Sequence, residues 1–154
     1  EFGPRALGAR SILANPRCRE MKSIINDRIK YRESFRPFCP SLLESDIKDY
    51  FLGKSEASPF MNINFEVKQD WRSQLGAITH IDGTARVQTV NKDHNPLFYS
   101  LLHQLKKDSG CSVVLNTSFN LSHEPMVESP RQAIASFFGG GMDSCLIGDF
   151  LVTK

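Results

Sequence analysis

A short apolar run, Ser112 to Leu115, leads directly into a segment of small polar residues, Asn116-Thr117-Ser118-Phe119-Asn120. An apolar, β-branched run of this length predicts a buried strand. Hydroxyls and amides at the end of such a strand lie at the mouth of a sheet, where open α/β sheets bind ligands. Because Asn and Ser also favour turns, a hairpin turn is the alternative interpretation. Asn116, Thr117, Ser118 and Asn120 are therefore candidate binding residues.

A second candidate segment is basic and runs Lys30-Tyr31-Arg32-Glu33-Ser34-Phe35-Arg36-Pro37-Phe38. Pro37 and Pro40 disfavour helix in the residues before them, so the chain is expected to be extended here. Alternate residues of an extended chain share a face, which places Lys30, Arg32 and Arg36 on one side. Three such cations suit a polyphosphate. A solvated basic surface is the alternative interpretation.

The rest of the chain alternates strand-like and helix-like patterns. Strands are expected at 11–14, 37–43, 60–67, 77–81, 84–90, 112–116, 144–147 and 150–152, and helices at 18–29, 46–51, 96–107 and 130–138. The predicted fold class is α/β (α+β), a twisted mixed sheet with packed helices. Strands 77–81 and 84–90 are expected to pair around the Asp82-Gly83 turn, and the last two strands to close the sheet. Helix 96–107 is expected to bury Leu97, Leu101, Leu102 and Leu105.

Composition indicates one domain over residues 1–154, since a chain of 154 residues can bury about two-thirds of its unfolded surface. A net charge of +2 argues against nucleic acid as a partner. The cysteines at 18, 39, 111 and 145 are too scattered for a metal site, so no metal ligands are expected, and reduced thiols indicate the cytoplasm. No apolar run approaches the roughly 20 residues that span a bilayer, so no membrane association is expected.

Two further charged groups are candidates for anion binding. The opening segment Gly3-Pro4-Arg5-Ala6-Leu7-Gly8-Ala9-Arg10 sets Arg5 and Arg10 among glycines, which let a backbone approach an anion closely. An interdomain turn explains this segment equally well. His80 and Arg86 are expected to face each other across the Asp82-Gly83 turn. No nucleophile-and-base set or Walker pattern appears, so the chemistry should depend on positioning and charge neutralisation.

The Lys-x-Arg and Arg-Pro-Phe residues at 30–38 and the Thr-Ser-x-Asn-x-Ser-x-Glu-Pro residues at 117–125 resemble the nucleotide-binding signatures of YrdC-like domains, found in threonylcarbamoyl-adenylate synthases. A broader resemblance connects residues 1–13, 35–38, 80–90 and 115–120, in this order, to the C-terminal domain of O-carbamoyltransferases. Those enzymes carbamoylate hydroxyls of nodulation factors, aminoglycosides and cephalosporin-type antibiotics. Four segments in sequence are far more specific than any one, and they extend over essentially the whole chain.

This resemblance implies a YrdC-like fold with a basic groove that binds ATP, Mg²⁺ and carbamoyl phosphate and forms carbamoyl-adenylate. By motif position, Lys30, Arg32 and Arg36 would hold the triphosphate, and Ser118 and Asn120 the nucleotide. Arg86 and His80 would be the catalytic residues that hold the carbamoyl donor, with Arg86 on its phosphate and His80 donating to an oxygen. Arg5 and Arg10 would belong to the shared domain boundary.

The resemblance also implies a partner domain and leaves two alternatives. A larger N-terminal domain, with the metal and acceptor sites, would precede residue 1, so this chain would carry out only the adenylation half-reaction. A threonylcarbamoyl-adenylate synthase and a non-catalytic nucleotide-binding or docking module are the alternatives. His123 stands where YrdC-like domains commonly have Gly, so the turn there is expected to differ locally.

Overall fold

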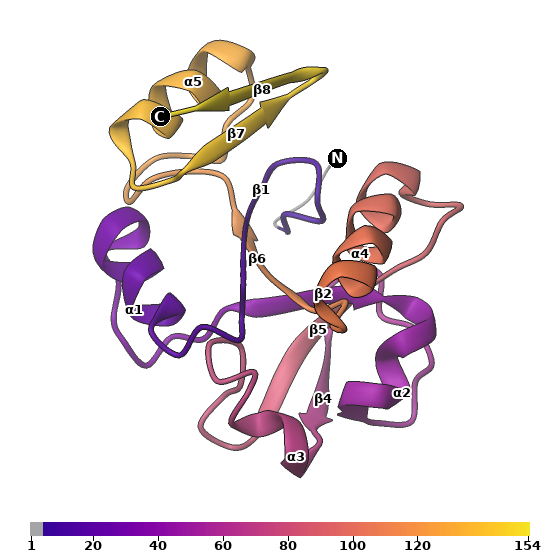
Figure 1. Cartoon of the computed structure of the whole chain (residues 1–154). Coiled ribbons are helices and arrows are strands. Elements are labelled where there is room, and N and C mark those ends of the chain that lie inside the picture. Colours follow the sequence, from indigo (N-terminus) through magenta and orange to yellow (C-terminus); the bar gives the residue numbers. More distant parts are fainter. Residues whose placement is uncertain (1–4) are drawn as a thin grey trace.

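A mixed sheet of six strands organises residues 5–154, which a computed structural model describes (Figure 1). In spatial order the strands are β1 (Ser11–Ala14), β6 (Val114–Ser118), β2 (Cys39–Leu43), β5 (Thr84–Val90), β4 (Ile63–Val67) and β3 (Phe51–Leu52). The central pair, β2 and β5, is parallel, and the other neighbours are antiparallel. The predicted mixed sheet with packed helices is therefore confirmed. Gly3 and Pro4 of the opening segment lie outside the described residues.

Short helices connect the strands, and two longer ones pack on them. They are α1 (Met21–Ile25) with a π-helical turn η1 (Asn26–Lys30), a 3₁₀ turn η2 (Glu44–Asp46), α2 (Ile47–Tyr50), α3 (Gln69–Arg72), α4 (Pro96–Ser109) and α5 (Pro130–Gly139). The predicted helices at 96–107 and 130–138 are confirmed, and both begin with a capping residue followed by proline. The predicted helix 18–29 begins later, at Met21, and its second half is the π-helical turn.

Strand alternation divides the core between the two faces of the sheet. On one face Leu43 and Val90 pack with Phe98 and Leu102 of α4. On the other face Leu42 of β2 belongs to the larger core, which extends to α5. All five residues of β2 are buried, as expected for a strand covered on both faces.

The buried stripe of α4 differs from the prediction. Leu97 and Leu101 are 71% and 51% exposed, whereas Phe98 and Leu102 are 4% and 0% exposed. The predicted set of four leucines is wider than one helical stripe, and Phe98 and Leu102 at i and i+4 determine which face turns inward.

Two predicted strand pairings are wrong. Residues 77–81 form turns after α3, with Ile78 N–H bonded to the Leu75 carbonyl at 3.1 Å, and β5 pairs with β4 and β2 instead. The last two strands, β7 (Ser144–Ile147) and β8 (Phe150–Thr153), form a separate antiparallel hairpin beside α5 and do not close the large sheet (Figure 1). A two-residue turn with Gly148 at φ 58° suffices to pair them locally.

Four cysteine thiols are free, and those of Cys39, Cys111 and Cys145 are buried. No helix within residues 5–154 is long and apolar enough to cross a bilayer.

Candidate functional site

Lys30 connects the two polar segments that the sequence singles out. Its side chain is 8% exposed, at the end of the π-helical turn. The ammonium donates to the Ser118 carbonyl at 2.6 Å and to the Asn120 carbonyl and Oδ1 at 2.9 Å, and it lies 3.2 Å from Ser118 Oγ. An ammonium has three N–H donors, so these four oxygens occupy all of them. A ligand that bonds to Lys30 must therefore replace one of these oxygens.

The three cations of the basic segment do not share one face, contrary to the prediction. Residues 31–38 form no strand, and Tyr31 turns the backbone with φ 44° directly after Lys30. Arg32 Nε donates to Asn26 Oδ1 at 3.3 Å, and its guanidinium lies 4.2 Å from the centre of the Phe38 ring. Arg36 is exposed and pairs with Glu33 at 3.6 Å. Lys30 and Arg32 thus turn inward, and Arg36 turns outward.

Arg86 lies on the same face of the sheet as Asn116 and Ser118. Its NH2 group donates to Cys39 Sγ at 3.1 Å, and Cys39 is the register partner of Asn116 on β6. Ser118 follows Asn116 by two residues, so the two share this face, whereas Thr117 points to the opposite one. Arg86, Asn116 and Ser118 are therefore brought together, and Thr117 is separated from them.

A buried polar network on this face was missed by the sequence analysis. Ser41 Oγ donates to Gln88 Oε1 at 2.6 Å, and Asn116 Nδ2 lies 2.9 Å from Ser41 Oγ and 3.0 Å from Gln88 Oε1. The three side chains come from adjacent strands and are at most 4% exposed. Polar residues within predicted strands, Ser41 in 37–43 and Gln88 in 84–90, were the available signal.

The opening segment reaches the same face through its backbone. Gln88 Nε2 donates to the Leu7 carbonyl at 2.9 Å. Arg5 and Arg10 are both half-buried, and Arg10 NH1 donates to the Val127 carbonyl at 3.2 Å. The described part of this segment therefore lies next to the polar network.

His80 is held in one tautomer by its neighbours. The Thr84 hydroxyl donates to Asp82 Oδ1 at 2.8 Å, so it accepts from His80 Nδ1 at 3.0 Å. Burial, together with Arg86 and Lys22, lowers the pKa of His80, although Asp82 opposes this shift. Neutral His80 therefore offers Nε2 as an acceptor, and donation from this atom requires the imidazolium. Asp82 also accepts from the Thr84 amide at 3.0 Å, which is the turn role considered for it.

Burial and neighbouring positive charges affect the pKa values of Lys30 and Arg32. Burial is the main cause that lowers the pKa of Lys30 to about 8, and Arg32 contributes to this shift against an opposing effect of Glu124. Burial and then Arg36 likewise lower the pKa of Arg32. No group of three His, Cys, Asp or Glu side chains that could hold a metal ion occurs among residues 5–154. The arrangement therefore suits an anionic ligand.

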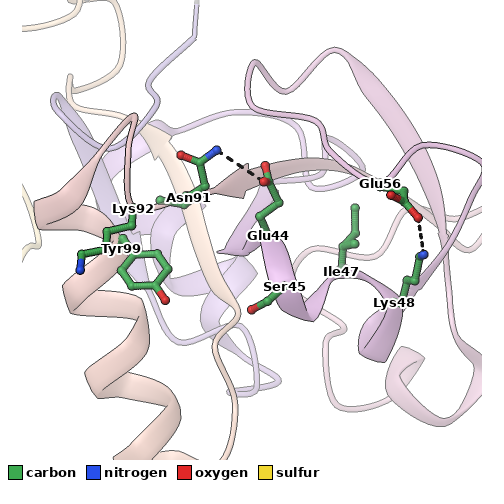
Figure 2. A pocket seen from close by; sticks show the side chains of 9 residues that line it. Glu44, Ser45, Ile47, Lys48, Glu56, Asn91, Lys92 and Tyr99 are labelled. Carbon is green, nitrogen blue, oxygen red and sulfur yellow. Dashed lines mark hydrogen bonds and ion pairs between the residues drawn. The ribbon is translucent and has the colours of Figure 1, made fainter.

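Two surface depressions differ in their relation to this site. The larger, a cleft of about 510 Å³, lies beyond the ends of β2 and β5 and contains none of the predicted site residues (Figure 2). Its Glu44 and Asn91 lie 3.4 Å apart, and Lys48 pairs with Glu56. The smaller depression is lined by Phe35, Pro37, His80, Ile81 and Asp82. It therefore adjoins the cationic site through His80.

The fold and the site define an α/β domain with a cluster of cationic and polar side chains on one sheet face. The chain belongs to the family described as carbamoyltransferase C-terminus, which matches residues 1–154. It is 47% identical to nodulation protein NolO of Bradyrhizobium diazoefficiens over 100% of this chain and 28% of that protein. It is 44% identical to nodulation protein NolNO of Sinorhizobium fredii, over 100% of this chain and 23% of that protein.

An uncharacterized protein of Methanocaldococcus jannaschii is 43% identical over 100% of this chain and 25% of that protein. The chain thus spans about a quarter of the length of these curated relatives. The relatives that it matches are therefore much longer than this chain.

Proposed function

We propose that this chain is the adenylating domain of a cytoplasmic O-carbamoyltransferase, which binds ATP and carbamoyl phosphate and forms carbamoyl-adenylate. The contact of Lys30 with Ser118 and Asn120 carries the proposal, because it joins two distant segments with phosphate- and nucleotide-binding residue types. Membership of the carbamoyltransferase family supports the transferred group.

The cationic residues take distinct roles in this proposal. Arg32 has Nε on Asn26 and one NH2 hydrogen toward the Pro37 carbonyl, which leaves the NH1–NH2 edge for two phosphate oxygens. Arg36 joins the triphosphate by leaving Glu33, and Lys30 exchanges a protein oxygen for a phosphate oxygen. Arg86, with Arg5 and Arg10, holds the phosphate of the carbamoyl donor. Mg²⁺ arrives on the ATP phosphates and shields their charge.

The proposed chemistry has two balanced steps. Water cleaves carbamoyl phosphate to carbamate and inorganic phosphate, and a carbamate oxygen then attacks the α-phosphorus of ATP. The bond from that phosphorus to the bridging oxygen breaks, and pyrophosphate leaves. The cations neutralise charge on both phosphate groups. In this proposal neutral His80 accepts the proton of the attacking water at Nε2, in place of the donor role that the sequence predicts for it.

The carbamoyl group would then pass to a hydroxyl acceptor in an N-terminal domain. The greater length of the relatives leaves room for such a domain.

Pyrophosphate release tests the proposal. With ATP, Mg²⁺ and carbamoyl phosphate present, release is expected to require both substrates and to fall at least about 100-fold in Lys30→Met. Lys48→Met is the matched control, because Lys48 is exposed and pairs with Glu56 far from this site. ATP binding without release would favour a non-catalytic module. Unchanged ATP affinity in both Lys30→Met and Ser118→Ala would contradict the proposed site.

A further inference from the structure

Three buried side-chain atoms have no hydrogen-bond partner in the described part of the chain. They are Asn116 Oδ1, Arg86 Nε and His80 Nε2. Buried polar atoms are almost always bonded, because leaving one without a partner is costly. Unsatisfied atoms near a cationic site therefore indicate which hydrogen-bond donors and acceptors a ligand supplies.

The orientation of the Asn116 amide follows from a main-chain carbonyl. The Leu7 carbonyl can only accept, so the Gln88 atom beside it must be Nε2, and Gln88 Oε1 must face Ser41 and Asn116. Because Gln88 Oε1 also only accepts, the Asn116 atom beside it must be Nδ2. Both hydrogens of Nδ2 are then used, by Gln88 and by Ser41 Oγ. Asn116 can offer a ligand nothing except the acceptor Oδ1.

An unsatisfied donor lies on the same face. Arg86 contacts Cys39, and Cys39 is the register partner of Asn116, so Arg86 and Asn116 flank Cys39 from β5 and β6. Arg86 Nε is an N–H donor, and Asn116 Oδ1 is an acceptor. The two atoms together complement a small group that has one acceptor and one N–H donor.

We infer that Arg86 Nε and Asn116 Oδ1 recognise a carbamoyl group, with Arg86 donating to its carbonyl oxygen and Asn116 accepting from its amino group. This inference rests on the proposed function and identifies the residue that selects a carbamoyl donor. It also changes the predicted role of Asn116, because Oδ1 would repel a phosphate oxygen. Asn116 Oδ1 is buried in the ligand-free chain, so binding requires a local displacement of its neighbours.

Acetyl phosphate is the probe that isolates the amino group. It has the phosphate and carbonyl of carbamoyl phosphate, with a methyl in place of the amino group. An acceptor built for an N–H disfavours a methyl, so the chain is expected to bind carbamoyl phosphate at least about tenfold more tightly than acetyl phosphate. Calorimetric titration of each compound into the 154-residue chain measures this ratio.

Three variants separate the contributions. Asn116→Leu keeps the side-chain size but removes the acceptor, so the ratio should fall to about one while the affinity for ATP is unchanged. Ser41→Ala is the matched control: it perturbs the same network, but Gln88 still orients Asn116, so the preference for carbamoyl phosphate should remain. Arg86→Lys lacks Nε and should weaken both compounds by a similar factor, because both have the carbonyl oxygen.

The outcomes distinguish this inference from the proposed function. If the chain binds ATP and both compounds but Asn116→Leu keeps the preference, the inference is overturned and the proposed function stands. Equal affinity of the unaltered chain for the two compounds also overturns it, since water alone then satisfies Asn116. If the unaltered chain binds neither compound nor ATP, both ideas fail. A loss of ATP binding in Asn116→Leu alone would assign Asn116 to the nucleotide and overturn the inference.

Discussion

Lys30 is a buried cation with a full set of bonds, and its charge depends on pH. Its ammonium contacts four oxygens of residues 118 and 120, and burial lowers its pKa to about 8. The sequence alone indicated a cation that matters here. It did not indicate that Lys30 would also fasten the loop after β6, because that contact spans 88 residues.

The affinity for ATP should therefore fall at alkaline pH. Below about pH 8 Lys30 is charged in the free chain, and binding is expected to be independent of this group. Above about pH 8 binding must add a proton back to Lys30, so affinity should decrease by up to tenfold per pH unit. Titrations from pH 7 to pH 9.5 measure this, with Lys30→Met as the control that loses the dependence. An equally steep decline in Lys30→Met would assign the effect to another group.

His123 is another residue whose backbone carries information. It has φ 67°, a left-handed conformation, at the position where the family resemblance predicted a glycine. His123 itself therefore adopts the left-handed backbone conformation that glycine ordinarily takes. A left-handed conformation costs a non-glycine residue about 1 kcal/mol.

Replacement of His123 by Gly should stabilise the chain. We expect the free energy of unfolding to rise by about 0.5 kcal/mol, because relief of the left-handed strain exceeds the entropic cost of glycine. His94→Gly is the control, since His94 is exposed and is not among the residues with positive φ. Urea denaturation should show a gain for the first variant and a loss for the second. A loss in both would mean that the strain at His123 is negligible.

Among the elements, those whose formation depends on a few neighbouring residues were predicted correctly from the sequence. The cap-and-proline starts of α4 and α5 and the strand at 11–14 are recognisable from a few neighbouring residues. The inward face of α4 was not, because four leucines offered competing stripes and Phe98 was left out. The strand predicted at 77–81 failed because β4 takes the edge of β5 that it would have occupied.

The corrected face of α4 can be tested with two leucines that are adjacent in sequence. Leu102→Ala should lower the free energy of unfolding by about 2–5 kcal/mol, because Leu102 is fully buried against Leu43, Val90 and Val114. Leu101→Ala should change it by less than about 1 kcal/mol, since Leu101 is half exposed. Chemical denaturation of both variants gives the comparison. Similar losses in both variants would mean that Leu101 also faces the core, as the sequence predicted.

Across the whole molecule, burial is high at the centre of the large sheet and low in the C-terminal β7–β8 hairpin. Strand β2 is buried along its whole length between β6 and β5, whereas Leu146 and Leu151 of the β7–β8 hairpin are 61% and 68% exposed. The mixed class of the sheet could be predicted from the sequence. The strand order could not, because it depends on pairings such as β2 with β6 that connect distant segments. The network of Ser41, Gln88 and Asn116 escaped prediction for the same reason.

Hydrogen exchange should reveal this gradient. Amides of β2, β5 and β6 are expected to exchange only with global unfolding, since these strands are central and buried. Amides of β7 and β8 should exchange at least about 100-fold faster, because a two-stranded hairpin is only marginally stable. Exchange followed by mass spectrometry or NMR measures both groups. Uniform protection across the chain would contradict the gradient.

The bond between Gln88 and the Leu7 carbonyl determines which substitutions can alter the network of Ser41, Gln88 and Asn116. Gly8, with φ 115°, packs so closely on the Phe98 ring that a Cβ would approach it to 2.5 Å, which holds the path of the chain at residue 7. The atom that orients the Gln88 amide, and through it the Asn116 amide, therefore belongs to the main chain. Substitutions at position 7 change only a side chain and leave the donor and acceptor pattern of Gln88 and Asn116 intact. A side chain at position 8 would instead displace the Leu7 carbonyl, and so change this pattern without any substitution in the network itself.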